Sequence, residues 1–114
     1  MIDRHDPAIC GSCGRTAIGY GYAPKPERPV IWVCDDPECL RLAKDSYDMK
    51  QDDFTRIESL AAQKGGEEGG AYLDEIGVTD LAKLTPDCWA EFCRRLVAGY
   101  RKALVRDLRN EAPF

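Results

Sequence analysis

Two cysteine pairs in the first third of the chain constrain its fold more than any other feature of the sequence. Cys10 and Cys13 are separated by two residues, and Cys34 and Cys39 by four. Ligands two residues apart reach adjacent corners of a tetrahedron from a single turn, and Zn²⁺ favours thiolate ligands. The first residues are charged where a secretory signal would be apolar, so the six cysteines indicate metal binding in a reducing cytoplasm rather than disulfides. The sequence predicts one structural zinc ion bound by these four side chains, with His5 as the weaker alternative ligand.

The residues around the cysteines predict a knuckle, a β-hairpin and a helix, in that order. Residues 17–22 and 30–33 have the aromatic and β-branched composition of strands, and the segment 24–29 between them is a proline-rich turn. Pro37 and Glu38 suit the first turn of a helix, so the second cysteine pair would join a strand end to a helix start. This order resembles that of a treble-clef zinc finger.

Apolar residues recur at helical spacing from residue 37, and we expect one long helix over 37–64. The glycines in Gly65–Gly70 are expected to interrupt it, and a short helix over 71–76 is expected to end at Gly77. The predicted class is therefore α+β, with residues 1–64 forming a zinc finger with its long helix and 65–114 forming a helical subdomain packed on it as one compact unit.

Capping residues mark the two remaining elements. Thr79 is expected to cap a turn over 80–84, and Thr85 with Pro86 is expected to open a last helix that runs to about Arg109. The polar face of that helix carries a basic stripe, and Trp32 lies near the finger. A nucleic-acid backbone or an acidic protein surface would suit this group, and a solvated charged face is the alternative. The stripe consists of Arg94, Arg95, Lys102, Arg106 and Arg109.

The charge distribution argues against a duplex-DNA-binding domain. The net charge is −4, and residues 35–84 hold six Lys/Arg against thirteen Asp/Glu, whereas 85–114 hold six against four. A DNA-binding domain usually has a basic footprint over its whole length. Any nucleic-acid contact would therefore be local, and the acidic middle offers a surface for a protein partner instead.

The sequence does not predict an enzyme or a small-molecule substrate. Four thiolates fill a zinc coordination sphere and leave no position for water. Cys88 and Cys93 project about 140° apart around a helix, and the only histidine available as a base is His5. No apolar run approaches the length of a membrane span, and we expect a cytoplasmic protein.

Two resemblances follow from specific residues. The terminal Pro113 and Phe114, after Glu111, resemble the acidic Pro-Phe tail by which bacterial single-stranded-DNA-binding proteins recruit replication and repair enzymes. In that family the terminal Phe docks in a basic pocket, which makes Phe114 a candidate binding residue. A second pattern spans most of the chain and consists of Cys10-Gly-Ser-Cys13, Trp32-Val-Cys34, Gly69–Gly77, Thr79–Pro86, Trp89 and Gly99-Tyr100. It resembles an uncharacterised family of small proteins from proteobacterial genomes and prophages, which implies a phage or mobile-element setting and little chemistry.

Two main functional hypotheses result, and an enzyme with a metal site among its carboxylates is the least favoured alternative. The first is a non-enzymatic zinc-binding interaction module that contacts nucleic acid or proteins of the DNA-processing machinery. The second is an acidic inhibitor or adaptor that binds a host enzyme.

Overall fold

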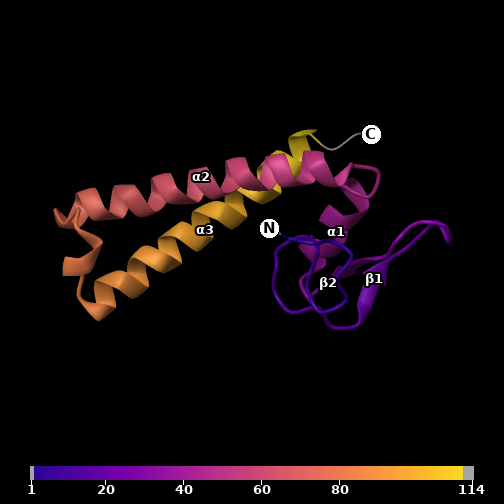
Figure 1. Ribbon diagram of the computed structural model, residues 1–114, viewed down its shortest axis with the longest axis horizontal. Helices are drawn as coiled ribbons and strands as arrows, with labels where there is room; N and C mark the ends of the chain where they lie inside the picture. The colour runs from indigo at the N-terminus through magenta and orange to yellow at the C-terminus, as the bar shows by residue number, and fades with distance from the viewer. Residues whose placement is uncertain (1, 112–114) are drawn as a thin grey trace. The chain divides into compact units, whose positions relative to one another are not determined.

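The computed structural model describes residues 2–111, in which a two-stranded antiparallel sheet is combined with three α-helices (Figure 1). The predicted combination of a hairpin with helices is confirmed. The described residues form two compact units, and the predicted boundary at residue 64 stays a prediction. The first unit comprises the described residues of Met1–Arg56 and Leu108–Phe114, and the second is Ile57–Asp107. The elements are β1 (Tyr20–Tyr22), β2 (Ile31–Val33), α1 (Pro37–Asp45), α2 (Gln51–Ile76), a 3-10 helix η1 (Leu81–Lys83) and α3 (Pro86–Glu111).

The hairpin supplies one wall of the core of the first unit. β1 pairs with β2 so that Tyr20 lies opposite Val33 and Tyr22 opposite Ile31. Successive side chains of a strand point to opposite faces, and the two β-branched residues of β2 are both buried in a cluster with the cysteines and Tyr47. The rings of Tyr22 and Tyr47 meet edge to face, with centroids 5.2 Å apart. The strands are shorter than predicted, but their pairing and their place in the chain are as expected.

α1 and α2 are separate helices, so the prediction of one helix over 37–64 is wrong. Ser46 follows α1, and its hydroxyl donates to a carbonyl of the preceding turn at 2.6 Å, a local bond that competes with helix continuation. The Arg4 guanidinium donates to the carbonyl oxygens of Ser46 at 3.0 Å and Met49 at 2.8 Å. In a continuous helix those carbonyls would accept from N–H groups four residues further on. The N-terminal segment therefore stabilises a break that helical periodicity does not indicate.

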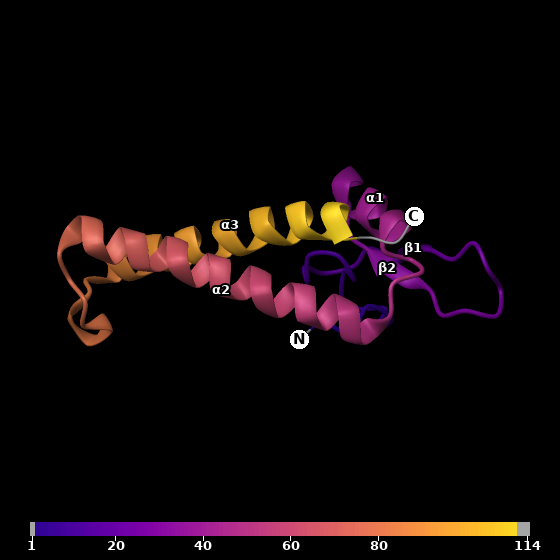
Figure 2. The same cartoon turned by 90° about the horizontal axis from the view of Figure 1, so that it is seen from above.

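The predicted interruption at 65–70 is also wrong, because α2 runs through this segment without a break and lies beside α3 (Figures 1 and 2). Gly65 and Gly69 are buried where the two helices meet. A Cβ atom at Gly65 would lie 2.5 Å from the carbonyl oxygen of Leu96, and one at Gly69 would lie 2.8 Å from the Phe92 ring. The glycines allow the helix backbones to approach closely, and their low helix propensity is overcome by tertiary packing.

The end of α2 follows the prediction. Gly77 has a φ of 70°, in the left-handed region that favours glycine. Its N–H donates to the carbonyl of Asp74 at 3.3 Å, and the N–H of Val78 donates to that of Leu73 at 3.2 Å. This pair of bonds is a Schellman motif, which satisfies the last carbonyls of the helix.

The start of α3 is also as expected. Thr85 is the cap, with its hydroxyl oxygen accepting from the N–H of Cys88 at 3.2 Å, and Pro86 is the first helical residue. The preceding turn is capped by Asp80 rather than by Thr79, because the Asp80 carboxylate accepts from the N–H of Ala82 at 3.0 Å. None of the helices in residues 2–111 combines the length and apolar composition needed to cross a membrane.

Candidate metal centre

The four cysteines of the two sequence pairs lie together in the first unit. The sulfur atoms of Cys10, Cys13, Cys34 and Cys39 are all within 4.8 Å of one another. Three of these side chains are buried, and that of Cys13 is partly exposed. The structure therefore brings together all four residues that the sequence predicts as ligands, and the group is able to hold a metal ion.

The sulfur separations suit a tetrahedral ion. Thiolates about 2.3 Å from a central ion occupy the corners of a tetrahedron whose edges are about 3.8 Å long. The sulfurs of Cys13 and Cys34, one from each sequence pair, are 3.8 Å apart. This edge connects the two pairs, and all four sulfurs lie within 4.8 Å of one another, so both pairs are able to bind a single ion.

The knuckle that carries the first pair is held by backbone hydrogen bonds. The N–H of Cys10 donates to the carbonyl of Arg15 at 2.7 Å, and the N–H of Gly14 donates to the carbonyl of Cys10 at 2.9 Å. Gly14 has a φ of 81°, a conformation that a residue with a Cβ rarely adopts. An isolated bridge between Ile9 and Thr16 closes the turn. The loop is therefore shaped to present both sulfurs to the same side.

The second pair is positioned by β2 and α1. Cys34 directly follows β2, and Cys39 lies in the first turn of α1. Asp36 caps that helix by accepting from the N–H of Glu38 at 2.9 Å. The hydroxyl of Ser12 donates to the carbonyl of Cys39 at 2.9 Å and so connects the knuckle to the helix. This bond between the two ligand-bearing segments could not be foreseen from spacing alone.

The thiols interact strongly with one another. Hydrogen bonds from the side chains of Cys13 and Cys39 lower the pKa of Cys10. The contact with Cys10 raises the pKa of Cys13 to about 11 and is also the largest cause of the raised pKa of Cys39. The group thus favours a thiolate at Cys10 and retains protons on Cys13 and Cys39. A bound cation would displace these protons, because metal ligands must be deprotonated.

The remaining candidates for metal or nucleophile chemistry lie elsewhere. His5 is not in the cysteine group, and its Nδ1 is 2.9 Å from the carbonyl oxygen of Val30. Cys88 and Cys93 lie on α3 and are partly buried. Hydrogen bonds with Thr85 and, to a smaller extent, with Tyr72 lower the pKa of Cys88. Within residues 2–111, no His, Asp or Glu joins either thiol in a metal-binding group.

The first two arginines of the predicted basic stripe are bound to carboxylates. Arg94 lies 2.7 Å and Arg95 2.9 Å from the oxygens of Glu91, one turn earlier on α3. Arg95 also contacts Glu75 of α2 at 3.0 Å. These bonds lower the pKa of Glu91, with the larger effect from Arg95. The two guanidinium groups therefore contribute little uncompensated positive charge.

The rest of the stripe shows the same tendency. Arg106 contacts Asp107 at 3.1 Å, and Arg109 forms an ion pair with Glu38 of α1. Lys102 is exposed, and no ion pair is found for it among the described residues. Trp32, on β2, is partly exposed on the opposite side of the strand from the core residues. The candidate Phe114 lies outside the described residues.

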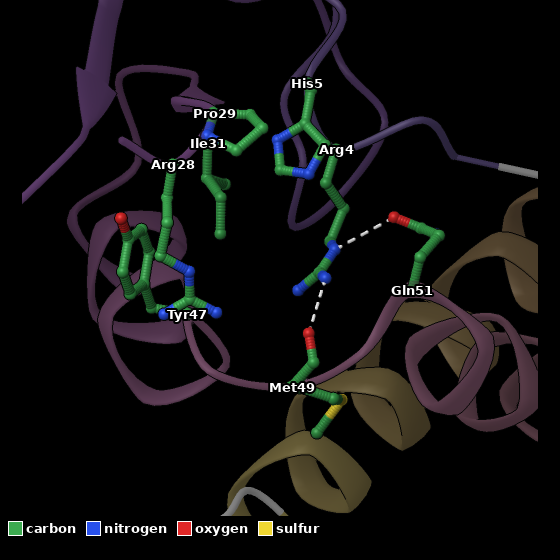
Figure 3. A pocket seen from close by; sticks show the side chains of 8 residues that line it. All are labelled: Arg4, His5, Arg28, Pro29, Ile31, Tyr47, Met49 and Gln51. Atoms are coloured by element: carbon green, nitrogen blue, oxygen red, sulfur yellow. Dashed lines mark hydrogen bonds between the residues drawn. The ribbon is translucent and has the colours of Figure 1, made fainter. Parts of the chain in front are cut away.

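One group of functional interest was missed by sequence reasoning. Arg4 and Arg28 line a pocket in the first unit (Figure 3). Both are isolated basic residues in the sequence, one in the leader and one in the hairpin turn. Their proximity depends on the break between α1 and α2, so no sequence signal could have revealed it.

Comparison with known proteins gives one match. The model of a family of unknown function (DUF6511) matches residues 51–114. The matched segment comprises α2 and everything after it, and it does not include the four cysteines. No curated protein and no solved structure matches the chain. An uncharacterised family is thereby confirmed, whereas the proteobacterial or prophage setting stays a prediction.

Proposed function

This chain belongs to the DUF6511 family, whose function is unknown, and we propose that it is a phage-related, non-enzymatic zinc-binding interaction module. It acts in the cytoplasm, where its thiols stay reduced. Its partner is a protein of the DNA-processing machinery or a nucleic acid. The metal-bearing unit has the segment order of a treble-clef finger and serves to organise a binding surface.

One observation carries this proposal: four cysteine sulfurs lie within 4.8 Å of one another, and three of the side chains are buried. Four tetrahedral sulfur ligands are typical of zinc or of iron–sulfur sites. Zn²⁺ with four thiolates has no open position for substrate or water, so its role is to stabilise the fold. This chemistry supports a structural ion and an interaction module rather than a catalyst.

The metal assignment is tested by loading the protein from medium that contains both zinc and iron. We expect one zinc per chain by elemental analysis and no visible absorption. One iron per chain, or a coloured protein, would replace the zinc assignment. A Cys39→Ser variant should lose the metal, whereas Cys93→Ser, which removes a thiol outside the group, should retain it.

The ion pairs of α3 favour a protein over a nucleic acid as the partner. Four of the five cations of the predicted stripe contact carboxylates. The chain has a net charge of −4, and binding to a phosphate backbone relies on uncompensated Lys and Arg. The acidic inhibitor or adaptor is the second candidate, and the thirteen carboxylates of residues 35–84 support it.

Oligonucleotide titration separates the two partner classes. With labelled single- and double-stranded oligonucleotides at physiological salt, we expect dissociation constants no tighter than about 10⁻⁴–10⁻⁶ M, the non-specific range. Nanomolar binding with a steep salt dependence would assign a nucleic-acid partner instead. A Glu91→Gln variant releases Arg94 and leaves Arg95 paired only with Glu75. It should therefore strengthen binding if the α3 stripe is the contact surface and leave it unchanged otherwise.

A further inference from the structure

A small pocket of about 170 Å³ in the first unit lies away from the cysteine group. Its walls come from the N-terminal segment, the hairpin and the link between α1 and α2, and Figure 3 shows the side chains that line it. Pockets for drug-sized ligands are roughly 300–1,000 Å³. A water molecule takes about 30 Å³ of liquid volume, so this pocket has room for about six waters. Its size suits a small ion or a single chemical group.

Arg4 forms one wall and is a buried cation. The residue is 3% exposed. Its guanidinium donates to the carbonyls of Ser46 and Met49 and to the side-chain oxygen of Gln51 at 3.1 Å, and it lies over the Phe54 ring at 4.9 Å. Arginine has five N–H donors, and the bonds found for Arg4 in the described residues use three of them. No carboxylate among those residues pairs with Arg4, so its charge is met only by neutral acceptors.

A second cation faces Arg4 across the pocket. The Arg28 guanidinium stacks on the Tyr47 ring at 4.8 Å from its centroid and lies on the other side of the pocket from that of Arg4 (Figure 3). Burial lowers the pKa of Arg4, and the charge of Arg28 lowers it further. Two like charges facing one cavity repel each other unless an anion lies between them.

The other charged groups around Arg28 lie outside the pocket. The Asp48 carboxylate contacts Arg28 at 2.5 Å and Lys25 at 3.7 Å, and neither Asp48 nor Lys25 lines the cavity. The polar lining includes His5, and Ile31 supplies an apolar wall. The cavity is therefore lined by cationic and neutral groups, and the carboxylate that binds Arg28 is not part of its lining.

We infer that this pocket binds a phosphate group between the guanidinium groups of Arg4 and Arg28. Phosphate would supply the negative charge that neither arginine finds inside the cavity. Guanidinium groups bind phosphate oxygens with directed, charge-assisted hydrogen bonds. The volume admits a phosphate group but not an entire nucleotide. The ligand is therefore inorganic phosphate or a terminal phosphate whose remaining part stays in solvent.

The test is calorimetric titration of the zinc-loaded full chain with inorganic phosphate, using chloride at equal ionic strength as the reference. We expect saturable binding at millimolar or lower concentration and a phosphate-dependent rise in melting temperature. Arg28→Gln should weaken binding by about tenfold or more, because it removes a charged hydrogen-bond donor. Absence of saturable phosphate binding would overturn the inference.

Matched variants separate this site from general electrostatics. Like Arg28→Gln, Lys25→Gln removes one positive charge that contacts Asp48, but Lys25 does not line the pocket. This variant should therefore leave phosphate affinity nearly unchanged. Asp48→Asn removes the competing carboxylate and should increase affinity. Equal losses in Lys25→Gln and Arg28→Gln would contradict a defined site. Arg28→Gln is preferred to a change at Arg4, which also holds the link between α1 and α2.

The source of the phosphate is resolved by a second comparison. A short oligonucleotide with a 5′-phosphate should bind better than the same oligonucleotide without it if a terminal phosphate is the ligand. Equal binding of the two, together with saturable inorganic phosphate, assigns a free anion. Zinc content measured on Arg28→Gln should remain at one per chain, so failure at this pocket is distinct from failure of the proposed metal centre.

Discussion

Each of the two compact units of this chain is stabilised internally by a different kind of interaction. The core of the first unit includes three of the four candidate metal ligands, beside a two-stranded hairpin and a nine-residue helix. A two-stranded sheet is marginal by itself, so we expect this unit to depend on a bound metal ion. The second unit consists mainly of α2 and α3, which approach closely at glycines, and its stability depends on how well the two helix surfaces fit together. We therefore expect the first unit to be sensitive to metal removal and the second to be sensitive to single added methyl groups, although the two units are similar in size.

Metal removal should give the largest difference between the units. Structural zinc contributes roughly 10–16 kcal/mol of apparent binding free energy in zinc-finger peptides, far more than any single contact. We expect a strong chelator to abolish hydrogen-exchange protection in residues 9–47 and to leave that of 57–107 largely intact. Equal loss of protection in both ranges would show that the units are one cooperative structure.

Gly65 tests the close helix contact in the second unit. In Gly65→Ala the new Cβ would lie 2.5 Å from a backbone oxygen of α3, which cannot rotate away as a side chain can. Overpacking of this kind costs about 1–3 kcal/mol, which exceeds the gain of about 1 kcal/mol in helix propensity. Denaturant unfolding should therefore show net destabilisation without altered metal content.

Gly66 is the matched control for that substitution. It is the next residue of the same helix, and a Cβ there would meet no atom within 4 Å. Gly66→Ala should stabilise the protein by about 0.5–1 kcal/mol, since only the propensity term remains. Destabilisation of similar size in both variants would contradict the assigned helix contact.

The Thr85 cap provides a smaller effect in the second unit. Thr85→Ala leaves the N–H of Cys88 without its side-chain acceptor, and loss of such a cap costs about 1 kcal/mol. Thr79→Ala, at an exposed residue that does not cap η1, should have almost no effect. Thermal melts of the two variants at equal zinc loading make the comparison.

The smallest effect concerns the ion pairs of Glu91 with Arg94 and Arg95. Because the folded-state pKa of Glu91 is lowered, the pairs stabilise the protein above the ordinary glutamate pKa, and this stability is lost as the pH falls through the lower folded value. The stability difference between the parent and Glu91→Gln should shrink over that acidic interval, and high salt should reduce it. A difference that grows toward acid would contradict the sign.

The sequence predicts a feature correctly where that feature follows from the local chemistry of one residue type. The cysteine spacing, the Thr85-Pro86 helix start and the Gly77 helix end all follow from local chemistry, and each is found as expected. These features need no knowledge of distant residues. The Thr85 cap, the helix end at Gly77 and the candidate ligands could therefore be assigned before the fold.

The wrong helix boundaries arise where contacts with residues distant in the sequence determine the local structure. Gly65–Gly70 has the composition of a break, but α3 approaches so closely at Gly65 and Gly69 that glycine is favoured at these two positions of α2. The link between α1 and α2 has helical periodicity, but Arg4 binds its carbonyls from more than forty residues away. Helix propensity and apolar periodicity are local properties of the sequence, so they do not reflect either contact. The phosphate pocket was missed for the same reason.

The central claim is that four thiolates of one chain share a single closed-shell ion. X-ray absorption at the zinc edge on the purified protein tests it most directly. We expect one zinc per chain with four sulfur neighbours at about 2.3 Å and no nitrogen or oxygen neighbour. A mixed shell containing nitrogen or oxygen, or a protein that is fully folded without bound zinc, would contradict the account.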